Sequence, residues 1–146
     1  MQELKERIVK EGKVLPGNII KVDGFLNHRI DTELMTHIAE EFGKHFNMDE
    51  VTMILTAEAS GIALSAIVAQ HFHKPMIFAK KAKSDNIEGG LYQSDIFSYT
   101  YKKKVTLLVS KEWLSADDKV LIIDDFMANG EAMRGLCDIV TAAGAT

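Results

Sequence analysis

Short apolar runs alternate along the chain with longer stretches in which apolar positions recur every three or four residues. Three of the short runs, at 51–56, 75–79 and 120–123, are bounded by polar or turn-forming residues. Such runs are typical of strands that are buried on both faces of a parallel sheet. We therefore predict three strands, of which 51–56 and 120–123 are of the buried type, and expect 120–123 to be central in the sheet.

The longer stretches have the spacing of amphipathic helices. They predict helices at 1–11, 31–47, 62–71 and 131–143. In the helix at 31–47, Asp31 is a plausible N-cap and the apolar face runs as far as Phe46. In the last helix, Cys137 is expected on or beside the buried face. Alternating residues at 91–110 indicate a hairpin that turns at 102–104.

This order of strands and helices predicts an α/β fold, a mostly parallel sheet flanked by helices, in one domain over 1–146. A net charge of −4 argues against a nucleic-acid partner, and a single cysteine excludes an internal disulfide. The first residues do not show the basic-then-apolar pattern of a signal peptide, and no apolar run is long enough to span a membrane. We expect a cytoplasmic protein that binds neither nucleic acid nor membrane. His37 and His45 flank a helix face without a third ligand, so we interpret them as surface residues and predict no protein-held metal.

The strand at 120–123 ends in Asp124 and Asp125, and a loop of small residues with Gly130 leads into the last helix. The unpaired N–H groups of a helix N-terminus suit a phosphate, and a glycine lets backbone come close to it. Carboxylates repel a phosphate but accept hydrogen bonds from sugar hydroxyls, or bind a divalent cation. The arrangement predicts a phosphorylated sugar along this loop. The alternative is an ordinary strand–turn–helix whose aspartates are solvated or cap the helix.

Residues 57–61 repeat the order of strand, small loop and helix. Their backbone can hold a second anion and Ser60 can add a hydroxyl donor, although a surface turn is the alternative. The polar stretch at 80–90 begins with Lys80 and Lys81 and is expected to be a mobile cationic loop, or else a solvated surface.

The sequence IIDDFMANGEAM resembles the phosphoribosyl-pyrophosphate motif of type I phosphoribosyltransferases, and KVDGFLNHRID is similar to the N-terminal segment of xanthine phosphoribosyltransferases. The resemblance runs to the final GAT. It implies the type I phosphoribosyltransferase fold, with a small hood to which 1–30 contribute and a flexible hairpin loop at 91–110 that closes over the site. It also implies a further strand and a C-terminal piece after 146, so we expect that the C-terminal part is missing.

The resemblance implies transfer of a 5-phosphoribosyl group from phosphoribosyl pyrophosphate (PRPP) to a purine, with xanthine preferred and Mg²⁺ bound mainly through the pyrophosphate. It assigns the ribose hydroxyls to Asp124 and Asp125, and the 5-phosphate to the loop at 128–132. The residues implied for PRPP are Ala59, Ser60, Gly61, Lys81, Asp124, Asp125, Ala128, Asn129, Gly130, Glu131 and Ala132, and those for the base are Ile20, Asn27 and Phe126. Glu58 does not suit pyrophosphate by charge and should face Mg²⁺, water or a basic neighbour.

The catalytic residue stays unidentified, because Ala128 stands where hypoxanthine-guanine members have an aspartate that accepts a proton. Two alternatives remain open: an adenine-type enzyme, and a purine-responsive transcription regulator that keeps the fold without the chemistry. The chain has no basic patch for DNA, which disfavours the regulator. The resemblance also implies a homodimer.

Overall fold

The computed structural model describes residues 1–17, 19–81, 90–98 and 103–146. The elements in chain order are α1 (Gln2–Glu11), β1 (Lys13–Leu15), β2 (Ile19–Lys21), the π-helical turn η1 (Asp23–Asn27), α2 (Thr32–His45), β3 (Met53–Ala57), α3 (Gly61–His71), β4 (Met76–Ala79), β5 (Leu91–Ser98), β6 (Lys103–Ser110), β7 (Val120–Ile122) and α4 (Glu131–Ala143). The three strands and all four helices predicted from the sequence are present, although β4 is an edge strand in which only Ala79 is buried. The predicted lysine-rich loop falls largely on 82–89, outside the described residues. The hairpin was predicted to turn at 102–104, but Lys103 and Lys104 already belong to β6 and pair with Ser98 and Phe97, so the turn lies before them.

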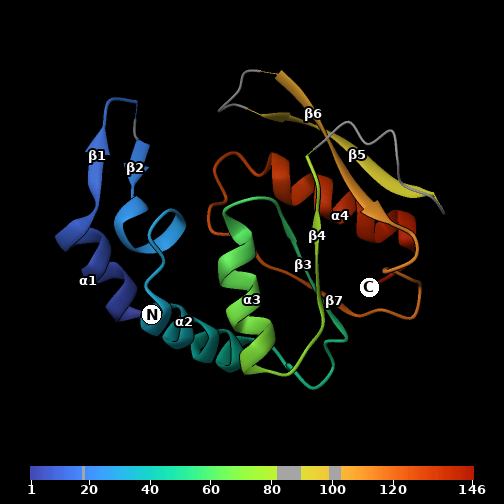
Figure 1. The fold of residues 1–146 in the computed structure, drawn as a ribbon, viewed down its shortest axis with the longest axis horizontal. Coiled ribbons are helices and arrows are strands. Elements are labelled where there is room, and N and C mark those ends of the chain that lie inside the picture. The colour runs from blue at the N-terminus through green and yellow to red at the C-terminus, as the bar shows by residue number, and fades with distance from the viewer. Residues whose placement is uncertain (18, 82–89, 99–102) are drawn as a thin grey trace.

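A three-stranded parallel sheet forms the middle of the molecule, in the order β4-β3-β7 (Figure 1). The central strand is therefore β3, and the expectation that 120–123 would be central is wrong for this sheet. On the other side of β7, the Val120 N–H donates to the Thr146 carbonyl at 2.6 Å, and the Thr146 N–H donates to the Asp118 carbonyl at 3.0 Å. The parallel arrangement places the carboxyl ends of β3 and β7 at the same edge of the sheet.

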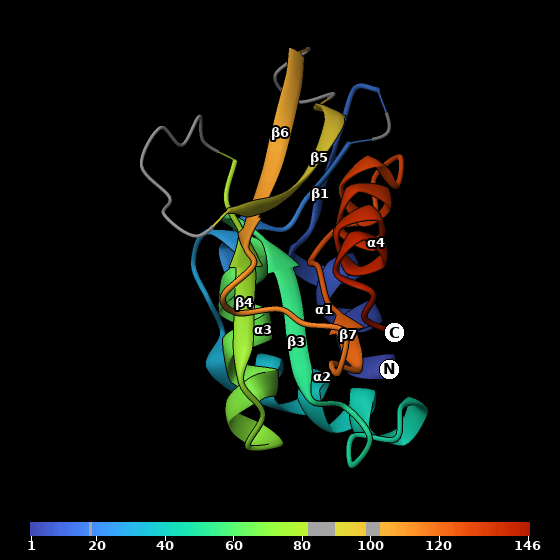
Figure 2. The same ribbon diagram turned by 90° about the vertical axis from the view of Figure 1, so that its right-hand side faces the viewer.

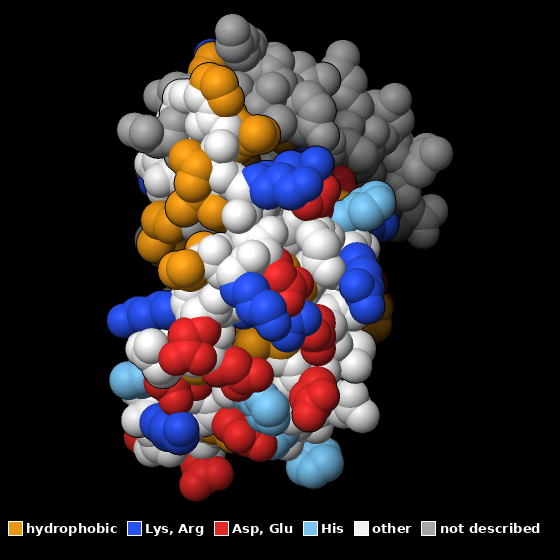
Figure 3. All heavy atoms as spheres, turned by 90° about the vertical axis from the view of Figure 1, so that its left-hand side faces the viewer, with side chains coloured by type: hydrophobic (Ala, Val, Ile, Leu, Met, Phe, Trp, Pro, Cys, Tyr) orange, Lys and Arg blue, Asp and Glu red, His pale blue; other side chains and the backbone are white. Residues whose placement is uncertain are grey.

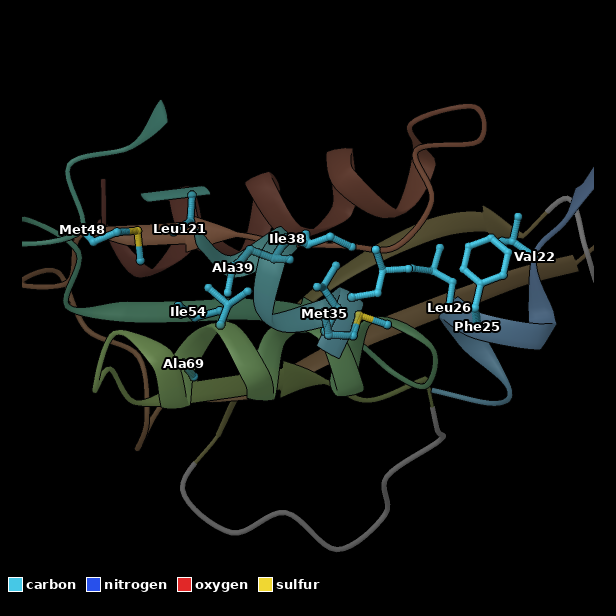
Figure 4. Close-up of a cluster of buried hydrophobic side chains, with 14 residues drawn as sticks. Val22, Phe25, Leu26, Met35, Ile38, Ala39, Met48, Ile54, Ala69 and Leu121 are labelled. Carbon is cyan, nitrogen blue, oxygen red and sulfur yellow. The ribbon is translucent and has the colours of Figure 1, made fainter. Parts of the chain in front are cut away.

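Successive residues of a strand point to opposite faces, and each face of this sheet is covered by a separate apolar cluster. Figure 2 shows α3 and α4 on opposite sides of β3. On one face, Ile54 and Leu121 pack with α2, α3 and η1. Figure 4 shows this cluster from Met48 to Val22, with Ile38 and Met35 of α2 in its middle. Asp31 caps α2 as predicted, because its carboxylate accepts the Leu34 N–H at 3.1 Å.

On the other face, Leu55 packs with α4 and with the antiparallel hairpin of β5 and β6. Gly135 lets this hairpin approach α4, since a Cβ there would lie 2.5 Å from Ile96 Cγ2. Gly135, Leu136 and Ile139 set which side of α4 is buried. Cys137 is exposed, so the expectation that it lies on or beside the buried face is wrong.

The N-terminal segment forms α1, the short antiparallel pair β1–β2 and η1, at one end of the molecule (Figure 1). The β1–β2 pair was not predicted, since its strands have three residues each and are exposed throughout. Phe25 and Leu26 of η1 are buried in the same cluster as Ile123, the residue that precedes the acidic pair. This packing holds the N-terminal segment close to the end of β7.

None of the helices described is long and apolar enough to cross a membrane.

Candidate active site

A cavity of about 200 Å³ lies beyond the carboxyl ends of β3 and β7, where the sequence predicts the site. Three structural units form its wall: the β3–α3 loop with the end of β4, the β7–α4 loop, and the facing side of the β5–β6 hairpin. The lining residues are Ala57, Glu58, Ser60, Lys81, Ile96, Phe97, Val105, Asp124, Asp125, Phe126, Met127, Ala128, Asn129, Glu131 and Ala132.

The two carboxylates lie at the floor of the cavity in unequal environments. Asp124 Oδ1 accepts the backbone N–H of Asp125 at 3.0 Å. Burial, followed by the adjacent Asp125 carboxylate, raises the pKa of Asp124 from 3.8 to about 6, while the positive charge of Lys81 opposes this rise. The pair is therefore short of positive or donating groups, a deficit that hydroxyl donors or a cation would fill.

Ser60 joins the two loops, since its hydroxyl donates to Asp125 Oδ1 at 2.8 Å. The other oxygen, Asp125 Oδ2, is buried and has no hydrogen-bond partner among the described residues. A buried acceptor without a donor costs free energy unless a ligand or water supplies one. Asp125 can thus accept a hydrogen bond from a ligand hydroxyl while Ser60 fixes its orientation.

Gly61 begins α3 next to the carboxylate of Asp124. A Cβ at this position would lie 2.2 Å from Thr56 Oγ1 and 2.6 Å from Asp124 Oδ1. No side chain fits in that space without moving one of them. The glycine thus allows α3 to begin against the carboxylate of Asp124.

The β7–α4 loop ends at Gly130, which has a left-handed φ of 77° and precedes the first turn of α4. Ala128 also has a positive φ, 44°. The Gly130 N–H donates to the Met127 carbonyl at 2.7 Å, which closes the loop. The backbone N–H groups of the first turn of α4 have no intrahelical partner and stand beside the cavity, so they can bind an anion.

Glu58 lines the opposite side, and its carboxylate accepts the backbone N–H of Lys81. It thereby joins the β3–α3 loop to the end of β4. The sequence expectation that Glu58 would not itself be an anion ligand stays a prediction, and this contact gives the carboxylate a donor within the chain.

Most of the residues predicted to bind PRPP line this one cavity: Ser60, Lys81, Asp124, Asp125, Ala128, Asn129, Glu131 and Ala132. Ala59, Gly61 and Gly130 belong to the same loops without lining it. Of the predicted base contacts, Phe126 lines the cavity, whereas Ile20 lies in β2 and Asn27 ends η1, both outside the lining.

The resemblance places the hairpin over the site, but sequence reasoning did not name the side chains that it contributes to the wall, which are Ile96, Phe97 and Val105. The alternation along 91–110 predicts two strands, but it does not say which element they pack against. The histidines have other contacts: His37 Nδ1 lies 2.9 Å from the Glu3 carboxylate. Within the described ranges, no group of three or more His, Cys, Asp or Glu side chains is placed to hold a metal ion.

Residues 25–146 match the family model described as "Phosphoribosyl transferase domain". Among the curated relatives, a xanthine phosphoribosyltransferase of Lachnoclostridium phytofermentans is 53% identical over 146 residues, which is 100% of this chain and 75% of the relative. A xanthine phosphoribosyltransferase of Bifidobacterium longum is 50% identical over 147 residues, which is 100% of this chain and 76% of the relative.

Solved structures give a second comparison. An adenine phosphoribosyltransferase of Saccharomyces cerevisiae superposes with a TM-score of 0.79 at 16% identity, over 100% of this chain and 85% of that one. An APRTase of Giardia lamblia complexed with 9-deazaadenine gives a TM-score of 0.78 at 22% identity, over 95% of this chain and 77% of that one. At these identities the likeness shows the fold alone, and it confirms the fold class expected from the sequence.

Proposed function

The chain belongs to the phosphoribosyltransferase family, and from that premise we propose that it transfers the 5-phosphoribosyl group of PRPP to xanthine, giving xanthosine 5'-monophosphate (XMP) and pyrophosphate. One observation carries the proposal for this site. Asp125 presents a buried oxygen that has no hydrogen-bond donor in the described part of the chain, and it lines the same cavity as the first turn of a helix that can bind a phosphate. The choice of xanthine rests on the names of relatives that are about half identical over the full chain.

Asp124 and Asp125 hold the ribose hydroxyls, and the loop at 128–132, which includes Glu131, holds the 5-phosphate. This assignment is supported by chemistry: carboxylates accept hydrogen bonds, whereas the start of α4 donates them. The sugar hydroxyls thus face hydrogen-bond acceptors, and the phosphate faces hydrogen-bond donors.

Pyrophosphate leaves toward the β3–α3 loop, where Ala59, Ser60 and Gly61 provide the backbone and Lys81 a positive charge. Mg²⁺, bound mainly through the pyrophosphate oxygens, supplies charge that neutralises the leaving group. The carboxylates of this site are oxygen donors of the kind that Mg²⁺ prefers, so the residues present fit the ion. Lys81 lines the cavity and its charge acts on the pKa of Asp124, which supports its place beside the polyphosphate.

The base lies against Phe126, with Ile20 and Asn27 of the N-terminal hood on its other side. Phe126 lines the cavity, and η1, which Asn27 ends, packs in the same cluster as Ile123. No general base is proposed, since xanthine loses a ring proton near neutral pH. A pH–rate profile that follows an enzyme group instead of the purine would contradict this step.

The direct test is nucleotide formation from PRPP and Mg²⁺ with xanthine, guanine, hypoxanthine or adenine, each supplied separately and the product identified by chromatography. We expect XMP to form with the highest kcat/KM. Preferential AMP formation would support the adenine-type alternative. No product from any base, with PRPP still bound, would support a regulator without the chemistry.

We also propose that the protein acts in the cytoplasm as a homodimer. Apolar side chains gather over α1 and the β1–β2 pair, and Val14 is 78% exposed and Ile19 56% exposed (Figure 3). Apolar patches of this kind mark interaction sites. Light scattering after size exclusion should give twice the chain mass, and Val14→Glu with Ile19→Glu should lower it. A wild-type mass of one chain would contradict the dimer.

A further inference from the structure

Arg134, one turn into α4, makes contacts with both its own helix and the hairpin. Its guanidinium donates to the Glu131 carboxylate at 3.1 Å, to the Asp138 carboxylate at 2.9 Å and to the Asp95 backbone carbonyl of β5 at 2.9 Å. Glu131 Oε2 accepts the Arg134 donor and also the backbone N–H of Phe97 at 3.1 Å. Glu131 and Arg134 therefore join the start of α4 to the strand that forms one wall of the cavity.

Glu131 is the first residue of α4 and lines the cavity. Its pKa is lowered, chiefly by the hydrogen bond from Arg134 and then by the Phe97 N–H, so the carboxylate is ionised at neutral pH. A carboxylate at the start of a helix competes with any other anion for the same N–H groups and repels it. If a phosphate is to bind at the start of α4, the Glu131 carboxylate needs a partner that neutralises its charge and holds it away from the phosphate.

We propose that Arg134 is a positioning residue for PRPP binding: it pairs with Glu131 and holds that carboxylate against β5, out of the phosphate position. The inference rests on the proposed function and adds a residue that the PRPP motif does not assign. Arg134 does not line the cavity, so it acts through Glu131 rather than on the phosphate itself.

A solvated ion pair three residues apart on a helix usually contributes little. This pair differs because each member has a further hydrogen bond to β5, the Arg134 guanidinium to Asp95 and the Glu131 carboxylate to Phe97. Among the described residues, loss of Arg134 leaves Glu131 with the Phe97 N–H as its remaining hydrogen-bond donor and removes the neutralising charge. The carboxylate is then free to turn toward the N–H groups of α4 that the phosphate uses.

The test compares Arg134→Gln, Glu131→Gln and the double variant by steady-state kinetics and by calorimetric titration with ribose 5-phosphate. Arg134→Gln should raise KM for PRPP about tenfold and weaken ribose 5-phosphate similarly, with kcat within about twofold of wild type. The double variant should recover most of the affinity, because the unpaired charge is gone. Arg134→Lys should lie between wild type and Arg134→Gln. Lys119→Gln removes a charge paired with Glu50, outside the cavity lining, and is the charge-matched control.

Unchanged affinity in Arg134→Gln would overturn the inference. A double variant as weak as Arg134→Gln would also overturn it, since Arg134 would then act on the phosphate or on the hairpin independently of Glu131. Thermal unfolding of each variant separates lost affinity from lost structure. Ribose 5-phosphate binding needs no turnover, so an enzyme that binds it but makes no nucleotide would overturn the proposed function and leave this inference standing.

Discussion

Two loops of the same design meet at the cavity, and their glycines are required for different reasons. In the β3–α3 loop, Gly61 has no room for a Cβ, because Thr56 and Asp124 stand 2.2 Å and 2.6 Å from its position. In the β7–α4 loop, Gly130 has a φ of 77°, and nothing lies within 4 Å of its Cβ position. Gly61 is required because there is no space for a side chain, and Gly130 is required because its backbone is left-handed.

The difference between the two glycines indicates that the two loops have different roles in the site. The β3–α3 loop contacts the acidic pair through the close approach of Gly61 to Asp124 and the hydrogen bond from Ser60 to Asp125. The β7–α4 loop leaves open space next to the N–H groups of α4. One loop therefore supports the carboxylates, and the other leaves room for the ligand.

The largest effect is expected where the two loops meet, at Asp125. Asp125→Ala removes the acceptor of the Ser60 hydroxyl and the buried oxygen assigned to ribose. A hydrogen bond to a charged group contributes about 1.5–3 kcal/mol, so loss of the one to ribose should lower kcat/KM for PRPP about ten- to a hundredfold. Asp117→Ala, which removes an exposed carboxylate before β7, is the control. Equal kcat/KM in the two variants would contradict the assignment of ribose to Asp125.

Substitution of the two glycines tests the comparison itself. Gly61→Ala forces Thr56 or Asp124 to move, which should cost about 1–3 kcal/mol of unfolding free energy and displace the acidic pair. In Gly130→Ala the added Cβ contacts nothing, but the alanine must adopt a left-handed backbone, which should cost about 1 kcal/mol of unfolding free energy. Denaturant unfolding measures both costs. A larger loss in Gly130→Ala than in Gly61→Ala would reverse the proposed roles of the two loops.

Ser60→Ala tests the hydrogen bond that joins the two loops without changing the backbone of either loop. Asp125 Oδ1 loses its hydroxyl donor while the backbone of both loops is kept. We expect KM for PRPP to rise about tenfold, the value of one hydrogen bond to a charged acceptor. Ser60→Thr keeps the hydroxyl and should retain more of the affinity. If Ser60→Ala and Ser60→Thr are equally impaired, the hydroxyl is not the feature that matters.

The smallest effect concerns stability and pH. The pKa of Asp124 is raised from 3.8 to about 6, so the fold favours its protonated form. Its contribution to stability is therefore greatest below its ordinary pKa and is lost as pH rises through about 6. Asp124→Asn removes the free-energy cost of burying a charged carboxylate. The Tm of this variant at about pH 8 should therefore exceed that of wild type by roughly 3 °C.

The Tm difference between Asp124→Asn and wild type should shrink toward about pH 4, where the wild-type carboxyl is protonated. Thermal unfolding followed by circular dichroism measures it at each pH. A difference that does not depend on pH would contradict the raised pKa. The more stable variant should nevertheless bind PRPP more weakly, because Asp124 is assigned to the ribose hydroxyls.

The strands and helices that form the site could be predicted because their patterns are local. β3 is buried on both faces and reads as a continuous apolar run, and Asp124 and Asp125 follow the similar run at 120–123. Errors arose where the structure depends on distant packing. Cys137 is exposed because α4 turns Gly135 toward the hairpin, where a Cβ on Gly135 would lie 2.5 Å from Ile96 and 2.9 Å from Leu107. These partners belong to another element, so the pattern within α4 does not identify them.

The same reason explains the residues that were missed in the site. Phe97 and Val105 line the cavity because the hairpin lies against α4, and Arg134 reaches Asp95 for that reason. Alternation along 91–110 predicts strands but not their partner. The exposed pair β1–β2 has no buried face that a pattern could reveal.

The most direct test of the two-loop site is a crystal structure of the protein soaked with ribose 5-phosphate. We predict that the ribose hydroxyls will lie within hydrogen-bond distance of Asp124 and Asp125, with the phosphate on the N–H groups at the start of α4. A phosphate bound at the β3–α3 loop, with Asp125 Oδ2 still without a donor, would contradict the division of roles between the two loops.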